Sequence, residues 1–354
     1  MKIAIITDTH WGVRNDNAAF LDNSRNFLNN IFFPHIEKLG IDTILHLGDL
    51  VDRRKHININ TAKRLREDFL YPLYHRQLNV HIIAGNHDTY YKNTNSVNAL
   101  REIVDERYGF RIYDQLPREV DFDGTTVLML PWICDENRTI CLDKIRSTPS
   151  QIVMGHLELA GFEMYRGSIV SHGDDRRIFD RFDMVLSGHY HHRSSDGSIH
   201  YLGSHAEFTW SDYDDPRGFH ILDTETRELT FIENPYKMFA KFWYDDVTEG
   251  KQPEGYDVEY LKGKNVKIIV SNKTDPYRFD MFINRIEKVG VLDLQVVEDH
   301  LNLAKEEDID IVNEAESTIN IFKRYIDQVN SPNLDKIKLE KTIVDLYQEA
   351  LAIE

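Results

Sequence analysis

Three things are scarce in this sequence of 354 residues, and each scarcity narrows the range of functions. Only two cysteines are present, Cys134 and Cys141, which excludes a disulfide framework and fits a reducing compartment. No stretch approaches the roughly 18 consecutive apolar residues of a membrane-spanning helix. Lysine and arginine number 42 against 59 aspartates and glutamates, so the net charge is −17. We therefore expect a cytoplasmic protein without a membrane anchor, whose contacts with polyanions are local rather than spread over a basic surface.

The apolar content is sufficient for a large core, because hydrophobic residues make up 41% of the chain. Over the first 220 residues, short apolar runs alternate with longer segments of helical period, such as the one that contains Phe20, Phe27 and Ile36 and ends at Gly40. This alternation predicts an α/β fold with a largely parallel sheet covered by helices. The expected strands are Lys2–Thr7, Thr43–Leu47, Val80–Ala84, Val127–Leu130, Gln151–Met154, Met184–Ser187, His200–Leu202 and Phe219–Leu222.

The pattern changes after Asn234-Pro235, which places an expected domain boundary between 1–235 and 236–298. The second range predicts a small β-α-β domain. Its expected elements are a strand at Val266–Val270, a helix at Arg278–Lys288 and a strand at Leu294–Val297.

Residues 299–316 contain seven carboxylates and one lysine, and this composition predicts an acidic linker. Two amphipathic helices are expected within 317–354, separated by Ser331-Pro332-Asn333. A helical pair of this kind does not bury its apolar stripe alone. We therefore expect it to dock on a partner, with packing on its own domain or self-association as the alternatives.

Five of the apolar runs end directly in residues that commonly bind metal ions. In a largely parallel sheet the carboxyl ends of the strands lie at one edge, where active sites are generally built, so residues far apart in the chain are expected to meet there. The five blocks are Asp8-Thr9-His10, Gly48-Asp49, Gly85-Asn86-His87-Asp88, Gly155-His156 and Gly188-His189-Tyr190-His191.

The donor atoms of these blocks suit two metal ions that share one ligand. Seven protein ligands are too many for one ion, whereas two ions with a bridging carboxylate leave positions open for water. Oxygen and nitrogen donors without thiolate favour Mn²⁺, with Mg²⁺, Fe²⁺, Co²⁺ and Zn²⁺ as alternatives. The expected ligands are Asp8, His10 and His191 on one ion, Asn86, His156 and His189 on the other, and Asp49 on both.

A pair of divalent ions about 4 Å apart favours in-line hydrolysis of a P–O bond, because it acidifies a water and neutralises phosphate oxygens. His87 follows the ligand Asn86 and is expected to protonate the leaving group or stabilise the transition state, the alternative being a hydrogen bond that supports a ligand. Asp52 lies three residues beyond Asp49 and is expected to hold the His87 imidazolium, unless it only caps the following helix.

In order and spacing, the blocks resemble the D-x-H, GD, GNH, GH and GHxH signatures of the calcineurin-like metallophosphoesterase family. Within that family the chain is similar to nuclease subunits of the SbcD type and of T4-like bacteriophages. The similarity covers most of the first 220 residues. It is carried by Trp11-Gly12 after the first block, Asp88 in the third block, Tyr201-Leu202-Gly203-Ser204 and, more weakly, Asp214-Asp215-Pro216-Arg217-Gly218-Phe219.

The resemblance implies a two-sheet αββα sandwich in 1–235, a small capping, DNA-binding domain in 236–298, and a C-terminal helical segment that docks on an SMC-like (SbcC-type) ATPase. It also implies a Mn-dependent DNA phosphodiesterase, acting as a double-strand exonuclease and single-strand endonuclease. Relatives process breaks and act in recombination and recombination-dependent replication, and their nuclease domains form homodimers. A chain encoded by a phage would work in the host-cell cytoplasm.

Positive side chains near the blocks are candidates for contacts to DNA phosphates, which give affinity without sequence preference. The alternative for each of them is an ordinary solvated surface position. The candidates are Arg14, Arg53, Arg54, Lys55, Lys92 and Arg193.

Two other functions stay open at this stage. Many nuclease relatives carry His where this chain has Asp52, and the run Gly48–Arg53 is similar instead to serine/threonine protein phosphatases of the same superfamily. A phosphoprotein or small-molecule phosphatase is therefore the main alternative. A scaffold with idle chemistry is the third, and the complete ligand set argues against it.

Overall fold

The computed structural model describes residues 1–104, 108–248, 255–298, 338–339 and 342. The predicted acidic linker lies outside these residues, and so does nearly all of the predicted helical pair. Residues Met1–Asp299 form one compact unit, and the fold described below is that of its described part.

The first of two large sheets has the strand order β14-β13-β1-β2-β3-β4. Strands β1 to β4 pair in parallel, and β13 pairs antiparallel with both β1 and β14. The predicted βαβαβ arrangement is thereby confirmed. The bounds are β1 (Lys2–Ile6), β2 (Thr43–His46), β3 (Asn79–Ile83), β4 (Arg111–Tyr113), β13 (Gly218–Asp223) and β14 (Leu229–Glu233).

The second sheet has the order β11-β12-β10-β7-β6-β5, with four parallel strands in the middle and an antiparallel strand at each edge. A short hairpin of β8 and β9 follows β7 in the chain. The bounds are β5 (Arg118–Phe122), β6 (Thr125–Leu130), β7 (Ile152–His156), β8 (Glu163–Tyr165), β9 (Ser168–Ile169), β10 (Met184–Gly188), β11 (Ser194–Ser195) and β12 (Ile199–Tyr201).

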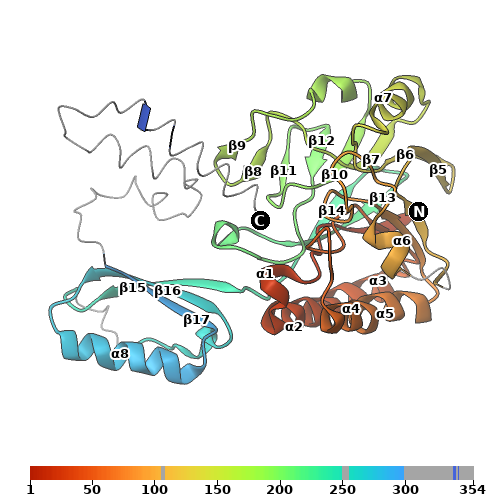
Figure 1. Cartoon of the computed structure of the whole chain (residues 1–354). Helices are drawn as coiled ribbons and strands as arrows, with labels where there is room; N and C mark the ends of the chain where they lie inside the picture. Colours follow the sequence, from red (N-terminus) through yellow and green to blue (C-terminus); the bar gives the residue numbers. More distant parts are fainter. Residues whose placement is uncertain (105–107, 249–254, 299–337, 340–341, 343–354) are drawn as a thin grey trace. The chain divides into compact units, whose positions relative to one another are not determined.

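The two sheets pack face to face, and helices cover their outer faces (Figure 1). One buried core joins Ile5 and Leu45 of the first sheet to Met129, Met154 and Leu186 of the second. This is the predicted αββα sandwich. Its helices and helical turns are α1 (Val13–Asp16), α2 (Ala18–Phe27), η1 (Leu28–Phe32), α3 (Phe33–Leu39), α4 (Ile59–Leu65), η2 (Arg66–Leu70), α5 (Tyr71–His75), α6 (Ala99–Ile103), α7 (Arg138–Ser147), η4 (Arg176–Phe179) and η5 (Trp210–Asp212).

The first long helical segment follows from local sequence signals. Asn17 precedes α2 and its side chain accepts a hydrogen bond from the Ala19 amide, which satisfies one of the free donors of the first turn. The segment runs through η1 and α3 to Gly40, whose φ of 63° ends the helix as predicted. Its inner side places Phe27 and Phe32 in the core beneath the first sheet.

A third, smaller sheet contains three parallel strands in the order β15-β16-β17, with a helix between the last two. The predicted β-α-β unit is confirmed, and β15 is an additional strand that the sequence analysis missed. The sheet and helix share their own buried core, whereas the boundary between 235 and 236 stays a prediction. The bounds are β15 (Phe239–Asp245), η7 (Glu259–Leu261), β16 (Asn265–Asn272), α8 (Pro276–Val289) and β17 (Asp293–Glu298).

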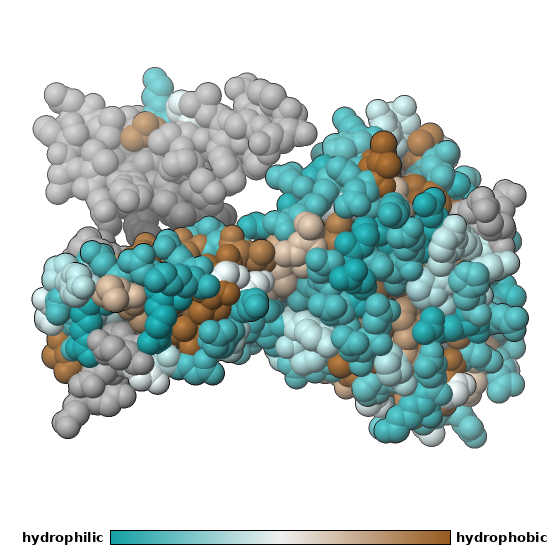
Figure 2. All heavy atoms as spheres, turned by 90° about the horizontal axis from the view of Figure 1, so that it is seen from below, coloured by the Kyte–Doolittle hydropathy of each residue, from teal (hydrophilic) through white to brown (hydrophobic). Residues whose placement is uncertain are grey.

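Within the part of the chain that the structure describes, no helix has the length and apolarity needed to cross a lipid bilayer. The face shown in Figure 2 is largely hydrophilic, with hydrophobic residues in small groups.

Candidate metal centre

The predicted ligands all lie at or just beyond strand ends. Four of them have a backbone in the left-handed region, with φ of 51° at Asp8, 42° at His10, 54° at Asp49 and 88° at His189. Such a conformation costs a non-glycine residue on the order of 1–3 kcal/mol. Strain concentrated at one edge of the sandwich is typical of a functional site, and here it turns the side chains toward one another.

Two glycines allow these strand ends to approach closely. A Cβ atom on Gly48, which has a φ of +99°, would lie 2.4 Å from Nδ1 of His156. A Cβ atom on Gly85 would lie 2.2 Å from Oδ1 of Asp49. Both positions therefore exclude any larger residue if the neighbouring donors are to keep their places.

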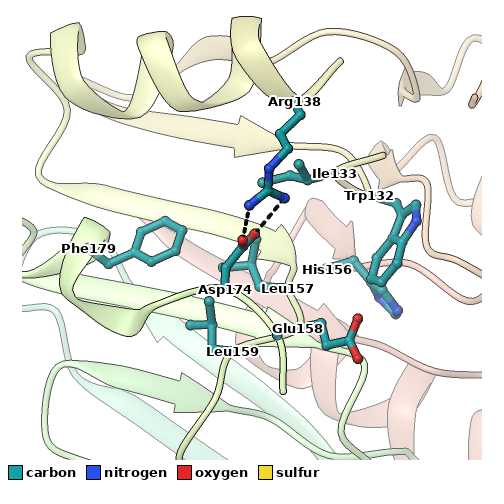
Figure 3. Close-up of a pocket in the computed structure, with 10 residues that line it drawn as sticks. Trp132, Ile133, Arg138, His156, Leu157, Glu158, Leu159, Asp174 and Phe179 are labelled. Carbon is teal, nitrogen blue, oxygen red and sulfur yellow. Dashed lines mark hydrogen bonds and ion pairs between the residues drawn. The ribbon is translucent and has the colours of Figure 1, made fainter. Parts of the chain in front are cut away.

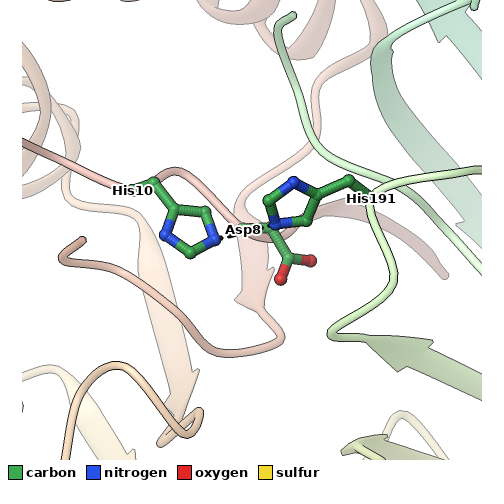
Figure 4. A group of neighbouring side chains, drawn as sticks. All are labelled: Asp8, His10 and His191. Atoms are coloured by element: carbon green, nitrogen blue, oxygen red, sulfur yellow. Dashed lines mark hydrogen bonds between the residues drawn. The ribbon is translucent and has the colours of Figure 1, made fainter. Parts of the chain in front are cut away.

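The first donor group consists of Asp8, His10 and His191, whose potential ligand atoms all lie within 4.8 Å of one another (Figure 4). The Nε2 atoms of His10 and His191 are 2.9 Å apart. Asp8 and His10 are buried and His191 is half-buried. These are the three residues that the sequence analysis assigned to one ion.

The second donor group consists of Asp49, His156 and His189, again within 4.8 Å, together with the amide oxygen of Asn86. Oδ1 of Asn86 lies 3.0 Å from Nε2 of His156 and 3.0 Å from Nδ1 of His189. The grouping agrees with the predicted second ion. Although His189 and His191 are only two residues apart, the turn at Gly188 and His189 directs them to different groups.

Asp49 lies between the two groups. Its Oδ2 atom is 3.6 Å from Nε2 of His10 and 3.3 Å from Nε2 of His156, which is the position a bridging carboxylate needs. Its Oδ1 atom accepts a hydrogen bond of 2.7 Å from the His87 amide. The carboxylate is thus held by the backbone on one side and open to both groups on the other.

The surroundings of His156 show whether these donors fit a cation. Its Nδ1 atom donates to the Leu47 carbonyl at 2.8 Å, so Nε2 is left to face oxygens of Asp49 and Asn86. Burial opposes a positive charge on the ring, but Asp49 and then Asp8 outweigh it and raise the pKa of His156 to about 9. Converging acceptors of this kind require a positive charge among them. Carboxylate, amide and imidazole donors together fit divalent metal ions.

His87 stands beside the first group without joining it. Its ring centroid is 4.9 Å from that of His10, and its Nδ1 atom donates to the main-chain carbonyl of Asp52 at 2.5 Å. The half-buried imidazole therefore keeps Nε2 for another partner. This geometry is consistent with the predicted role beside the ligands, which stays a prediction.

The predicted pairing of the Asp52 carboxylate with His87 stays a prediction, and the structure adds a contact of that carboxylate with His10. Oδ1 of Asp52 lies 3.5 Å from Nδ1 of His10, and only the carbonyl of Asp52 makes a hydrogen bond to His87. The reason is local: Val51 pairs with Trp11 in a parallel bridge, and the Asp52 amide donates to the Trp11 carbonyl. These contacts fix the Asp52 backbone next to the first block.

Two further residues shape the site. Asp88 is fully buried and accepts hydrogen bonds from the amides of Gly85 and Val51, which ties the second and third blocks together. Trp132 was missed by the sequence analysis; its ring centroid lies 5.3 Å from that of His189. The available signal was its position two residues beyond β6, at the same edge of the sheet as the ligands.

The basic candidates differ in their surroundings. Arg53 forms an ion pair of 3.1 Å with Asp16, and Lys55 lies 6.0 Å above the ring of Tyr90. Arg53, Arg54 and Lys55 all line a cavity of about 190 Å³. Arg193 lies 4.0 Å above the ring of Phe231. Arg14 and Lys92 are exposed, and a DNA contact for any of the six stays a prediction.

Comparison with known proteins agrees with this geometry. Residues 1–193 match the family described as calcineurin-like phosphoesterase. The chain is 31% identical to exonuclease subunit 1 of Enterobacteria phage T4, over 99% of each protein. It is 25% identical to the SbcD subunit of the nuclease SbcCD of Staphylococcus epidermidis, over 96% of this chain and 97% of that protein.

Among solved structures, one described as a novel archaeal phosphodiesterase covers 66% of this chain and 99% of its own, at 16% identity. The TM-score of 0.33 is too low to support a conclusion about the fold.

Proposed function

Because this chain belongs to the calcineurin-like phosphoesterase family, it is a metal-dependent phosphodiester hydrolase, and we propose that its substrate is DNA. It would act as a double-strand exonuclease and single-strand endonuclease in break processing, recombination and recombination-dependent replication. The observation that carries the proposal is the convergence of seven donors in two groups around Asp49. The nuclease relatives, one of them similar over the full length, favour this function over a phosphatase.

We propose that Asp8, His10 and His191 hold one ion, that Asn86, His156 and His189 hold a second, and that Asp49 contacts both. Mn²⁺ is the ion we favour. When bound, the ions neutralise charge on the phosphodiester and acidify the attacking water. His87 would then give a proton to the leaving oxygen from Nε2, since its Nδ1 atom is engaged with the Asp52 carbonyl.

The acidic chain needs help to hold DNA, because its net charge is −17. The names of both relatives describe them as subunits. We propose that residues 317–354 dock on an SMC-like ATPase that supplies much of the contact with DNA, while Arg14, Arg53, Arg54, Lys55, Lys92 and Arg193 contribute local phosphate contacts.

A homodimer of the nuclease domain completes the proposal. Ile59 at the start of α4 is 89% exposed, and Val97 just before α6 is 42% exposed. Apolar side chains at these two places are what a second copy would cover. Sedimentation equilibrium is expected to give twice the mass of 41.6 kDa, and a monomer at micromolar concentration would contradict this part of the proposal.

The function is tested by assaying purified protein with Mn²⁺. Linear duplex DNA should be degraded and single-stranded DNA should be nicked, EDTA should abolish both activities, and phosphopeptides should be left intact. Robust phosphopeptide hydrolysis without DNA cleavage would support the phosphatase instead.

A further inference from the structure

A cavity of about 220 Å³ lies directly beside the second donor group (Figure 3). His156 forms part of its wall, and the ring of Trp132 lies next to it, with 6.0 Å between the two ring centroids. A space of this size admits one aromatic heterocycle. The lining residues are Trp132, Ile133, Arg138, His156, Leu157, Glu158, Leu159, Gly173, Asp174 and Phe179.

One side of the wall is apolar or aromatic. Leu157, Leu159 and Phe179 are buried, whereas Trp132 and Ile133 are half-buried. An aromatic ring next to a site that holds phosphate is the usual platform for a stacked base, because every base has a flat face.

The other side of the cavity is polar. The guanidinium of Arg138 grips the Asp174 carboxylate with both of its terminal nitrogens, as the dashed lines in Figure 3 show. Glu158 lies nearby and pairs with His172 at 3.1 Å. Donors and acceptors therefore stand side by side, and such a pair is able to serve the polar edge of any base.

The backbone at Gly173 and Asp174, on the polar side of the cavity, is closely packed. Gly173 has a φ of +104°, and a Cβ atom there would lie 2.6 Å from the carbonyl oxygen of Glu158. The Asp174 amide donates to that same carbonyl. The polar side of the cavity is thus fixed to the segment that directly follows β7, whose last residue is His156.

Resting on the proposed nuclease function, we infer that this cavity receives one unpaired nucleobase of the strand being cut. The base stacks on Trp132 with its polar edge toward Arg138 and Asp174, while its own phosphate lies at the two donor groups. Only a base that has left its stack can turn its flat face to the ring of Trp132, so duplex DNA must first give up a base. The cavity thereby selects single strands and frayed ends for cleavage.

The first test needs no variant. Single-stranded oligonucleotides of one sequence, each with one abasic residue at a successive position around a fixed cleavage site, are assayed with Mn²⁺. One position next to the cut should lower the cleavage rate roughly tenfold, since stacking of a single base contributes that much. Fluorescence anisotropy in EDTA, where no cleavage occurs, should show a weaker affinity for the same oligonucleotide.

The second test fills the cavity. Ile133→Phe adds bulk at the half-buried wall, and Ile140→Phe makes the same change on α7 at a position that is 52% exposed and does not line the cavity. Cleavage of intact single strands should fall roughly tenfold in Ile133→Phe only, and the abasic position should no longer matter in that variant. The binding of two Mn²⁺ ions, measured by isothermal titration calorimetry, should be the same in all three proteins, which shows that the donor groups are intact.

The outcomes separate this inference from the proposed function. If DNA is cleaved but no abasic position changes the rate or the affinity, the cavity does not take a base. The same conclusion follows if the abasic effect persists in Ile133→Phe. If bis(p-nitrophenyl) phosphate is hydrolysed and DNA is not cleaved at all, the proposed nuclease function is wrong, and the inference about the cavity is wrong with it.

Discussion

At the scale of single residues, the proposed chemistry depends on a histidine that adjoins the metal ligands without being one of them. His87 contacts the Asp52 carbonyl through Nδ1 and, with His10 and Asp52, forms a separate set of possible ligand atoms that all lie within 4.8 Å of one another. We predict that His87→Ala still binds two Mn²⁺ ions while DNA cleavage falls roughly 10²–10⁴-fold, the range expected for loss of a general acid. Isothermal titration calorimetry gives the stoichiometry, and a gel assay gives the rate. A stoichiometry below two would show that His87 is a ligand.

Asp52 is predicted to act through His10. Its carboxylate lies 3.5 Å from Nδ1 of His10, and a partner of this kind fixes the orientation of a ligand ring. Asp52→Asn should therefore weaken the affinity for one of the two ions about 10- to 100-fold and leave the other ion nearly unaffected. Asp143→Asn serves as the control, because Asp143 is exposed on α7 and its carboxylate pairs, among the described residues, only with Arg146. Equal loss at both ions would contradict this assignment.

The grouping of the donors was predictable because parallel strands place their carboxyl ends at one edge. That rule brought Asp8 and His191 together although they are 183 positions apart. The rule gives no side-chain direction within a loop, which is why the contact of the Asp52 carboxylate with His10 was not predicted. Nor does the rule identify residues such as Trp132, whose role follows from its contacts with the rings of His156 and His189.

At the scale of secondary-structure elements, strands buried on both sides were predictable, whereas the edge strands of the two large sheets were not. β1, β2 and β7 consist almost entirely of buried residues, so their apolar runs are continuous. β5 and β14 have only partly buried or exposed side chains over most of their length. Their pairing depends on a neighbouring strand that is remote in sequence, and local pattern carries little of that information.

The junction before β15 contains a buried acid. Oε2 of Glu207 accepts hydrogen bonds from the amides of Met238 and Phe239, at 2.7 and 3.1 Å, and its Oε1 has no hydrogen-bond partner among the described residues. Burial raises the pKa of Glu207 to about 7, even though the two amides and Lys237 act in the opposite direction. The protonated form is therefore favoured in the folded state.

This raised pKa predicts a pH dependence of stability. Between the unfolded value of about 4.5 and a folded value of about 7, the folded protein holds a proton that the unfolded chain has released. The free energy of unfolding should therefore fall as pH rises through this window, by on the order of 3 kcal/mol, and level off above it. Glu207→Gln should remove that part of the slope, as measured by urea denaturation in EDTA at several pH values. Parallel curves for the two proteins would show that Glu207 is ionised in the fold.

At the scale of the whole molecule, the position of the donors and the net charge indicate which part of the complex catalyses and which part binds DNA. All seven donors come from residues 8 to 191, inside the compact unit Met1–Asp299, so the proposed chemistry is complete without the C-terminal residues. A chain with net charge −17 nevertheless repels DNA at long range. Catalysis and much of the DNA affinity are therefore expected to reside in different subunits.

Removal of residues 317–354 should leave metal-dependent hydrolysis intact and abolish binding of the proposed ATPase partner. The truncated protein is expected to bind two Mn²⁺ ions and to hydrolyse bis(p-nitrophenyl) phosphate within about twofold of the full chain, because every proposed ligand is retained. It should no longer co-purify with its SMC-like ATPase partner. A point variant sharpens the test. The predicted apolar stripe of the first helix consists of Ile319, Phe322, Ile326 and Val329, so Ile326→Asp should weaken co-purification, whereas Gln328→Asp, off that stripe, should not. Unchanged co-purification of the truncated chain would place the docking surface elsewhere, and loss of Mn²⁺ binding would show that the C-terminal residues support the metal centre.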